Sequence, residues 1–382
     1  VSILAERLGL VVTAQATSIM IVLIFGAGTD YMLFISSRFK EQLNLGMNVK
    51  DSIAETMTKI SPAILSSALT TILAMLALCF ATLRSFQVLG PILALGMSFA
   101  IISGLTFIPA ILSLLGKLAF WPRSTSSNSR GETAAGFWYR VADLVDRKPL
   151  FIVVTSVVTL LFMSTGVLTM KPSFNLRDSL PDNTESVQGY LTIQKSFPSG
   201  SISPTNVFVV LEETAIDHLG IIESITGTLS SIPGISSVTS PSRPFGNRIE
   251  LEVEEYADHL RHISSSDPNP NTQVAERMNI TPTFGELPNE NYLFESYLAA
   301  ERLMSNSGRI VRLDVVFQDD PGSLESLEKI KSIRQSLDQF NSYPIRKIVV
   351  GGDTAIQYDT KSANNRDIKT IAPIVLIIIF VI

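Results

Sequence analysis

A single carboxylate lies inside the first long apolar stretch of the sequence. The run Gly26-Ala27-Gly28-Thr29-Asp30-Tyr31 belongs to a segment, about residues 13–36, that contains no Lys or Arg. Asp30 precedes Arg38 by eight positions, which corresponds to roughly 12 Å along a helix. If Arg38 marks the edge of a bilayer, Asp30 lies near the middle of a hydrocarbon core about 30 Å thick. The pattern therefore predicts an acidic side chain deep inside a membrane.

An acidic residue at this depth is expensive, and its neighbours indicate what it could do. A charged carboxylate there costs at least ~2.5–3.5 kcal/mol on insertion scales, and such residues mark ion or proton paths. The predicted spans hold no Lys or Arg to pair with Asp30, and burial without a countercharge favours a neutral carboxyl. Asp30 is therefore a candidate for gaining and losing a proton near neutral pH, and the hydroxyl of Tyr31 could bond a carboxyl or pass a proton. The alternative is a hydrogen-bonded Asp30 that only fixes helix packing.

Small and hydroxyl-bearing residues accompany this pair. Gly26 and Gly28 remove side-chain bulk on the turn before Asp30, which lets another helix approach closely, and Thr29 lies between them and Asp30. We interpret these three residues as helix-packing positions. Four further hydroxyl residues in the second predicted span could line the same interior, or could be ordinary polar residues of a membrane helix: Ser66, Ser67, Thr70 and Thr71.

Four segments are apolar and long enough to cross a bilayer, which takes about 20 residues. Three lie within a first membrane part, residues 1–116, and one follows a linker at 117–149. They are predicted at about 13–36, 62–82, 86–115 and 150–170. The apolar run at 370–382 is typical of the start of a fifth, truncated span, so we expect the sequence to be a fragment of a longer protein.

The placement of basic residues predicts the orientation. Lys and Arg are concentrated in the loop 37–60 and in the linker 117–149, whereas the turn between the second and third spans holds only Arg84. Cytoplasmic loops carry the excess of Lys and Arg. The loop and the linker should therefore face the cytoplasm, which places residues 171–369 on the outer side of the cell membrane.

Residues 171–369 have the pattern of a separate polar domain. They hold 18 Lys and Arg against 27 Asp and Glu, while the rest of the chain holds 12 against 8. Strand–helix–strand patterns occur at 206–240 and 309–351, and two such units imply a ferredoxin-like sandwich. The stretch 250–307 between them is predicted to be largely helical. The expected fold class is a membrane protein with an α-helical transmembrane bundle plus an extracytoplasmic α+β domain with two β-α-β units.

Several functional classes lack support in the sequence. There is no P-loop, no G-x-S-x-G and no H-E-x-x-H motif, so we expect no enzyme. His259 and His262 have no Cys beside them, and we expect neither a metal nor a cofactor. The acidic balance of the polar domain leaves no basic patch of the kind that nucleic acids require.

The stretch Gly26–Leu43 (GAGTDYMLFISSRFKEQL) resembles the signature of MMPL-family transporters, within the resistance-nodulation-division (RND) superfamily. The resemblance continues through residues 61–96 and 105–116. It implies that the chain covers the end of the third span to the start of the eighth. It also implies a role for Asp30 and Tyr31 in a proton relay whose partner residues lie in a later span.

The resemblance implies export of lipids or other hydrophobic compounds, driven by the proton gradient. The alternative hypothesis is a non-exporting RND-like membrane protein whose outer domain binds a protein or lipid partner, as a secretion accessory or a sensor. Expected partners are the lipid bilayer, a hydrophobic or lipid substrate and the second half of the same protein. The sequence predicts neither the substrate nor the oligomeric state.

Overall fold

We describe the protein from a computed structural model. It describes residues 13–121, 137–166, 173, 176–197, 199–249, 251–264 and 289–382. The chain forms two compact units, one made of Val1–Pro172 with Ala363–Ile382 and the other of Ser173–Ser362. We refer to them as the membrane unit and the polar unit.

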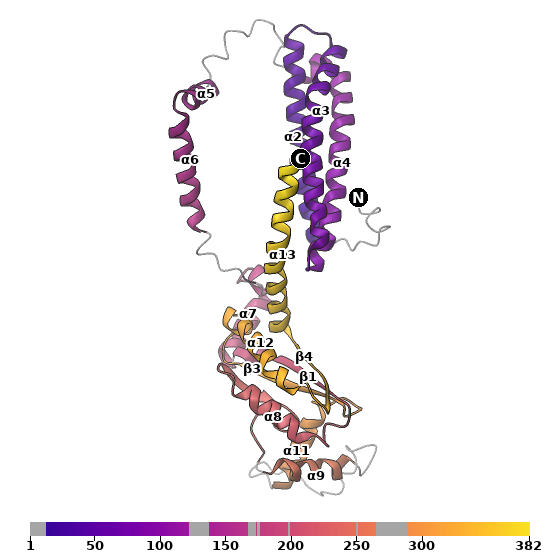
Figure 1. The fold of residues 1–382 in the computed structure, drawn as a ribbon, viewed down its shortest axis with the longest axis vertical. Coiled ribbons are helices and arrows are strands. Elements are labelled where there is room, and N and C mark those ends of the chain that lie inside the picture. Colours follow the sequence, from indigo (N-terminus) through magenta and orange to yellow (C-terminus); the bar gives the residue numbers. More distant parts are fainter. Residues whose placement is uncertain are drawn as a thin grey trace. The chain divides into compact units, whose positions relative to one another are not determined.

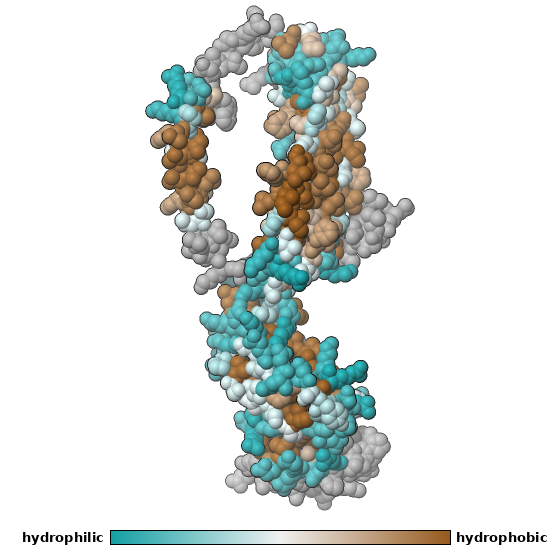
Figure 2. All heavy atoms as spheres, in the orientation of Figure 1, coloured by the Kyte–Doolittle hydropathy of each residue, from teal (hydrophilic) through white to brown (hydrophobic). Residues whose placement is uncertain are grey.

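Three helices of the membrane unit are long and apolar enough to cross a membrane (Figure 1). They are α2 (Ala14–Asn44), α3 (Val49–Ala77) and α4 (Arg84–Leu115). Short 3₁₀ turns, η1 (Leu78–Phe80) and η2 (Gly116–Phe120), follow α3 and α4. Figure 2 shows the apolar residues of these helices as a band with hydrophilic residues at one end. The helices pack against one another through a shared core that includes Ile35, Phe39 and Met97.

The observed helices extend beyond the apolar segments that the sequence predicted. Helix α3 begins at Val49 rather than near residue 62, because the side chain of Asn48 accepts a hydrogen bond from the Asp51 N–H and caps the helix. Helix α2 continues to Asn44, past the predicted end at 36. In both cases the added turns carry charged residues, which hydropathy does not detect although they continue the helix.

Two shorter helices precede the polar unit along the chain. They are α5 (Phe137–Arg147) and α6 (Pro149–Ser164), and α6 is apolar throughout. With 16 residues α6 is shorter than the span predicted at 150–170, and residues 167–170 lie outside the part of the chain that the structure describes. Residues 122–136 of the predicted linker lie outside it as well.

The polar unit contains a four-stranded antiparallel sheet in the order β2-β3-β1-β4. Its strands are β1 (Thr205–Leu211), β2 (Ile235–Thr239), β3 (Ile310–Phe317) and β4 (Ile345–Gly351). Helix α8 (Leu219–Ser230) joins β1 to β2, and α12 (Leu324–Leu337) with the turn η7 (Asp338–Phe340) joins β3 to β4. β1 and β2 are both antiparallel to β3, which lies between them, so each β-α-β unit is split by a strand of the other. This confirms the predicted ferredoxin-like class.

The core of this sheet follows from alternation along the strands. Val207, Val209 and Leu211 of β1 are buried at every second position, as expected for a strand with one face against the core. Ile222 and Ile330 are among the core residues that α8 and α12 contribute. Helix α12 starts at Leu324, because the hydroxyl of Ser323 accepts a hydrogen bond from the Ser326 N–H as the N-cap.

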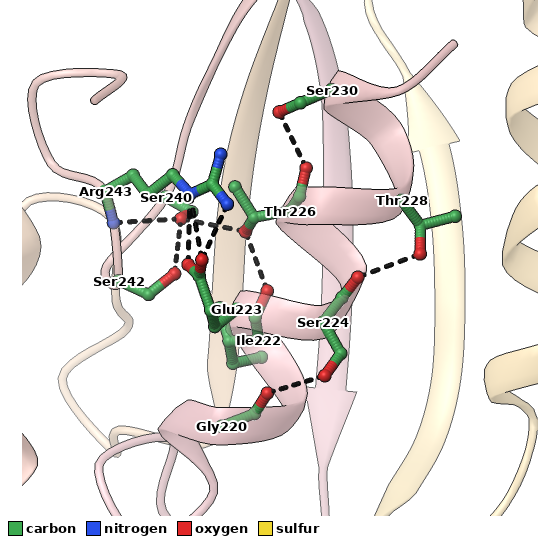
Figure 3. A network of polar contacts seen from close by, with 10 residues as sticks. All are labelled: Gly220, Ile222, Glu223, Ser224, Thr226, Thr228, Ser230, Ser240, Ser242 and Arg243. Carbon is green, nitrogen blue, oxygen red and sulfur yellow. Dashed lines mark hydrogen bonds and ion pairs between the residues drawn. The ribbon is translucent and has the colours of Figure 1, made fainter. Parts of the chain in front are cut away.

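A network of polar side chains holds the segment after β2 against α8 (Figure 3). Arg243 donates to the Glu223 carboxylate through Nε at 3.1 Å and through a terminal nitrogen at 2.6 Å. The Thr226 hydroxyl donates to Ser240 at 2.9 Å, and Ser240 in turn lies 3.0 Å from the Ser242 hydroxyl. The polar groups of this region are therefore satisfied by one another.

The polar unit contains three further helices. Helix α7 (Glu185–Ser196) lies before β1 in the chain, between the 3₁₀ turns η5 (Leu176–Ser179) and η6 (Ser199–Ile202). Helices α9 (Val253–Ser264) and α11 (Asn289–Glu301) belong to the stretch between β2 and β3. Tyr256 and Tyr297, from α9 and α11, share a buried cluster with Leu219 of α8. Residues 265–288 of the stretch predicted to be largely helical lie outside the described residues. Finally, one helix, α13 (Asp353–Val381), covers both the polar stretch after β4 and the terminal apolar run.

Candidate functional site

Asp30 lies on the exposed face of α2 within the membrane unit. It shares this face with Val22, Gly26 and Phe34, which are spaced by four residues and are also exposed. Among the described residues Asp30 has no hydrogen bond and no ion pair. The ion pairs of the membrane unit join other residues near helix ends, such as Arg38–Glu41 and Lys59–Glu55. A carboxylate therefore stands alone on an apolar helix face.

Tyr31 points in a different direction from Asp30. Consecutive helix residues are rotated by roughly 100° about the axis, and Tyr31 falls on the stripe with Ile35, Phe39 and Leu43, all of them buried. Only 5% of Tyr31 is exposed. Its hydroxyl is buried and has no hydrogen-bond partner in the described part of the chain. The two residues of the predicted pair thus belong to two faces of one helix, one turned out of the α2–α3–α4 bundle and one turned into it.

The small residues beside Asp30 occupy open positions. A Cβ atom added at Gly26 or Gly28 would meet nothing within 4 Å. The hydroxyl of Thr29 donates to the carbonyl oxygens of Phe25 at 2.9 Å and Gly26 at 2.8 Å, so it is occupied by its own helix. The described residues thus leave room at the two glycines, and a packing role would involve groups other than the described ones.

The hydroxyl residues of α3 likewise bond to their own helix. Thr70 donates to the Ser66 carbonyl at 2.9 Å and Thr71 to the Ser67 carbonyl at 3.0 Å. The side chains of Ser66 and Ser67 are exposed, and those of Thr70 and Thr71 are partly so. None of the four has a hydrogen bond with Asp30 or Tyr31 in the described structure. A role in lining an interior remains a prediction.

Two residues that the sequence analysis did not single out are prominent in the structure. Gly104 of α4 lies directly against the Tyr31 ring: an added Cβ would come within 3.0 Å of Tyr31 Cδ2. The spacing of Gly96, Ala100 and Gly104 by four residues is a sequence signal that this face of α4 is approached closely by another helix, but it does not identify Tyr31 as the neighbour.

Asp367 of α13 is the second. Only 3% of it is exposed, and its carboxylate accepts hydrogen bonds from the Thr82 N–H at 2.6 Å and the Leu83 N–H at 3.0 Å, just before α4. Burial raises the pKa of Asp367, but the backbone hydrogen bonds of Leu83 and Thr82 outweigh it, and the pKa lies below its ordinary value. No local pattern in the sequence relates Asp367 to a turn more than 280 residues away.

The polar unit has a separate concavity of about 460 Å³. Charged side chains of both signs line it, namely Asp217, Arg261 and Glu301, together with the apolar bodies of Tyr297 and Met304. Arg261 and Asp217 form an ion pair at 3.1 Å across part of its wall. The described residues of the chain contain no cluster of His, Cys, Asp and Glu that could hold a metal ion.

The architecture defines a class: an α-helical membrane protein with an α+β domain of two β-α-β units. Comparison of sequences assigns the family. The chain matches the MMPL family over residues 1–152 and 178–382, and it belongs to this RND-related family of membrane transport proteins.

Individual relatives agree with this assignment. The chain is 29% identical to the Streptomyces coelicolor membrane protein SCO5905 over 99% of its own length and 38% of the relative's. It is 26% identical to the apo-petrobactin exporter of Bacillus anthracis, covering 98% of the chain and 44% of that protein. With the probable transport protein MmpL10 of Mycobacterium leprae the identity is 28%, over 70% of the chain and 28% of the relative. The chain thus spans less than half the length of these relatives.

Proposed function

We propose that the protein to which this chain belongs is a proton-driven exporter of lipids or other hydrophobic compounds, with Asp30 and Tyr31 in its proton relay. The observation that carries the proposal is the lone carboxylate of Asp30 on an apolar face of a helix long enough to span a membrane. The printed names of the Bacillus anthracis and Mycobacterium leprae relatives, an exporter and a transport protein, support it.

The position of Asp30 on an apolar face of α2 explains how it could couple proton movement to transport. A charged carboxylate facing lipid is costly, and membrane proteins turn such groups toward a protein interior or a water-filled cavity. The exposed stripe around Asp30 is therefore covered in the whole protein by further membrane helices. A carboxyl in such a contact can take up a proton from one side of the membrane and release it to the other when the covering helices move, which is the requirement for coupled transport.

The orientation is part of the same proposal. Basic residues are concentrated in the loop 37–60 and in the linker 117–149, so these segments face the cytoplasm. Residues 171–369 then lie outside, and the whole protein is a multi-pass protein of the cell membrane. An extracytoplasmic domain in this position would receive a hydrophobic compound after it leaves the bilayer.

The test is the substitution Asp30→Asn in the full-length protein. Proton-coupled transport is measured in inverted membrane vesicles as the release of protons from an established pH gradient on addition of hydrophobic probes, including a fluorescent short-chain phospholipid. We expect Asp30→Asn to abolish coupling and Asp30→Glu to retain part of it. Glu41→Gln is the matched control, because Glu41 is a carboxylate near the end of the same helix whose ion pair with Arg38 is exposed. Proton-coupled transport by Asp30→Asn at the wild-type rate would refute the proposal.

A second candidate function is a non-exporting membrane protein whose outer domain binds a partner. The concavity of the polar unit favours it, since paired Asp217 and Arg261 beside Tyr297 could hold a zwitterionic or polar group. Two results together would favour this second function over export. No hydrophobic probe would cause proton release, and a lipid or polypeptide would bind to the polar unit in the wild type but not in Arg261→Ala.

A further inference from the structure

The buried position of Tyr31 depends on a residue of another helix. The Tyr31 ring lies over Gly104 of α4, where an added Cβ would be 3.0 Å from Cδ2, 3.5 Å from Cβ and 3.6 Å from Cγ of the tyrosine. Contacts of 3.0 Å are tighter than packed carbon atoms normally show. A side chain at residue 104 would force the ring to give way by a few tenths of an ångström.

Gly104 is one of three small residues that α4 turns toward α2. Gly96, Ala100 and Gly104 recur every fourth residue, and such spacing lets two membrane helices approach closely. At Gly96 an added Cβ would come within 2.7 Å of Met20 Cγ and 3.2 Å of Ile24 Cδ1, so crowding there acts on residues other than Tyr31. At Gly104 the neighbour is the rigid ring of Tyr31, and a displacement of the ring is passed on to its hydroxyl.

The hydroxyl that would be displaced is chemically unusual. It is buried and has no partner in the described structure, although 95% of the residue's surface is covered and a tyrosine hydroxyl in such a place normally forms a hydrogen bond. A buried, unpaired O–H inside the bundle is available to a water molecule or to a group outside the described residues. Whether it reaches that group depends on its position to within a few tenths of an ångström.

We infer that Gly104 is a positioning residue for the proton relay, because it determines where the Tyr31 hydroxyl lies. Helix α4 then contributes to the relay itself and does not only pack against α2. The inference rests on the proposed function of Asp30 and Tyr31. Proton transfer requires heavy atoms within about 2.6–3.2 Å of each other. A displacement near 1 Å can reduce such a step about 100-fold.

The experiment is a double-mutant cycle in the full-length protein, measured as the pH profile of proton-coupled probe transport in inverted vesicles. Gly104→Ala is made in the wild type and in Tyr31→Phe. We expect Gly104→Ala to lower the rate about tenfold or more and to shift the pH profile. In the Tyr31→Phe protein, which keeps the ring but has no hydroxyl, the same change should lower the rate no further.

The matched control is Gly96→Ala, which adds the same methyl group to the same helix two turns away. We expect any loss of rate in this variant to leave the pH profile in place and to be the same with either residue at position 31, because the added methyl group meets Met20 and Ile24. Membrane abundance and thermal stability in detergent are measured for every variant. If Gly104→Ala does not accumulate, Gly104→Ala combined with Ala100→Gly restores space one turn away and replaces it in the cycle.

The possible results of this cycle distinguish a failure of the role inferred for Gly104 from a failure of the proposed function. An equal loss from Gly104→Ala with either residue at position 31 would show that Gly104 serves helix packing alone and would overturn the inference. A wild-type rate for Tyr31→Phe together with an inactive Asp30→Asn would overturn it as well and would remove Tyr31 from the relay, while proton-driven export through Asp30 would stand. An active Asp30→Asn would refute the proposed function first.

Discussion

Two charged sites, one in each unit of the chain, differ in whether the charge has a partner. In the polar unit, Glu223 and Arg243 have side chains only 14% and 19% exposed, and they satisfy each other through three short contacts. In the membrane unit, Asp30 stands on an apolar helix face with no partner among the described residues. Paired charges are compatible with a purely structural role. An unpaired charge on an apolar membrane face is costly, and we attribute its presence to function.

The largest effect on stability should follow from breaking the paired site. Arg243→Ala leaves the Glu223 carboxylate mostly buried without its partner, which should destabilise the protein by about 2–4 kcal/mol. Thermal unfolding of the full-length protein in detergent measures this. The double variant Arg243→Met/Glu223→Leu should recover most of the loss, because the uncompensated charge is removed as well. Equal stability of the single variant and the wild type would contradict the contrast between the two units.

Asp367 provides the intermediate case of a carboxylate held mainly by backbone N–H groups. Asp367→Ala leaves the Thr82 and Leu83 N–H groups without their acceptor and should cost about 1–3 kcal/mol. The pKa of Asp367 is below its ordinary value in the folded protein. Its contribution is therefore fully present above the unfolded value of about 3.9 and is lost as the pH falls through the folded value.

The direction of the pH dependence of stability at Asp367 can be checked with Asp367→Asn. The difference in thermal stability between wild type and Asp367→Asn should be constant from about pH 7 to pH 5 and should shrink below about pH 4. A difference that grows on acidification would mean that Asp367 is protonated in the folded protein.

The smallest effect is expected on the open side of α2. Gly26→Ala meets nothing within 4 Å in the described structure, so it should change thermal stability by no more than about 0.5–1 kcal/mol, in the stabilising direction. If Gly26 admits a helix of the rest of the protein, the same substitution should lower proton-coupled transport. A wild-type transport rate would remove Gly26 from the packing positions proposed around Asp30.

Sequence reasoning predicted the parts of this molecule that depend on local pattern. Hydropathy located the three long apolar helices, and strand–helix–strand patterns located both β-α-β units, because burial on one face of a strand or helix imposes a period on its residues. Helix ends were predicted less well: capping by Asn48 and Ser323 sets them, and hydropathy carries no information about caps.

The site was predictable only in part, for a physical reason. Asp30 is conspicuous because a carboxylate contrasts with the apolar residues around it. The sequence could not predict that Tyr31 turns into the bundle onto Gly104, or that Asp367 accepts from the turn before α4. Both contacts join residues that are distant along the chain, and they depend on how helices rotate and pack.

Infrared difference spectroscopy of the full-length protein in lipid can follow the exchange of protons at Asp30 within the membrane. We expect a protonated-carboxyl C=O band that appears on acidification, disappears on return to alkaline medium and is absent from Asp30→Asn. Glu41→Gln should retain the band. A spectrum in which no such band is lost in Asp30→Asn would mean that Asp30 does not exchange protons, and it would contradict the account.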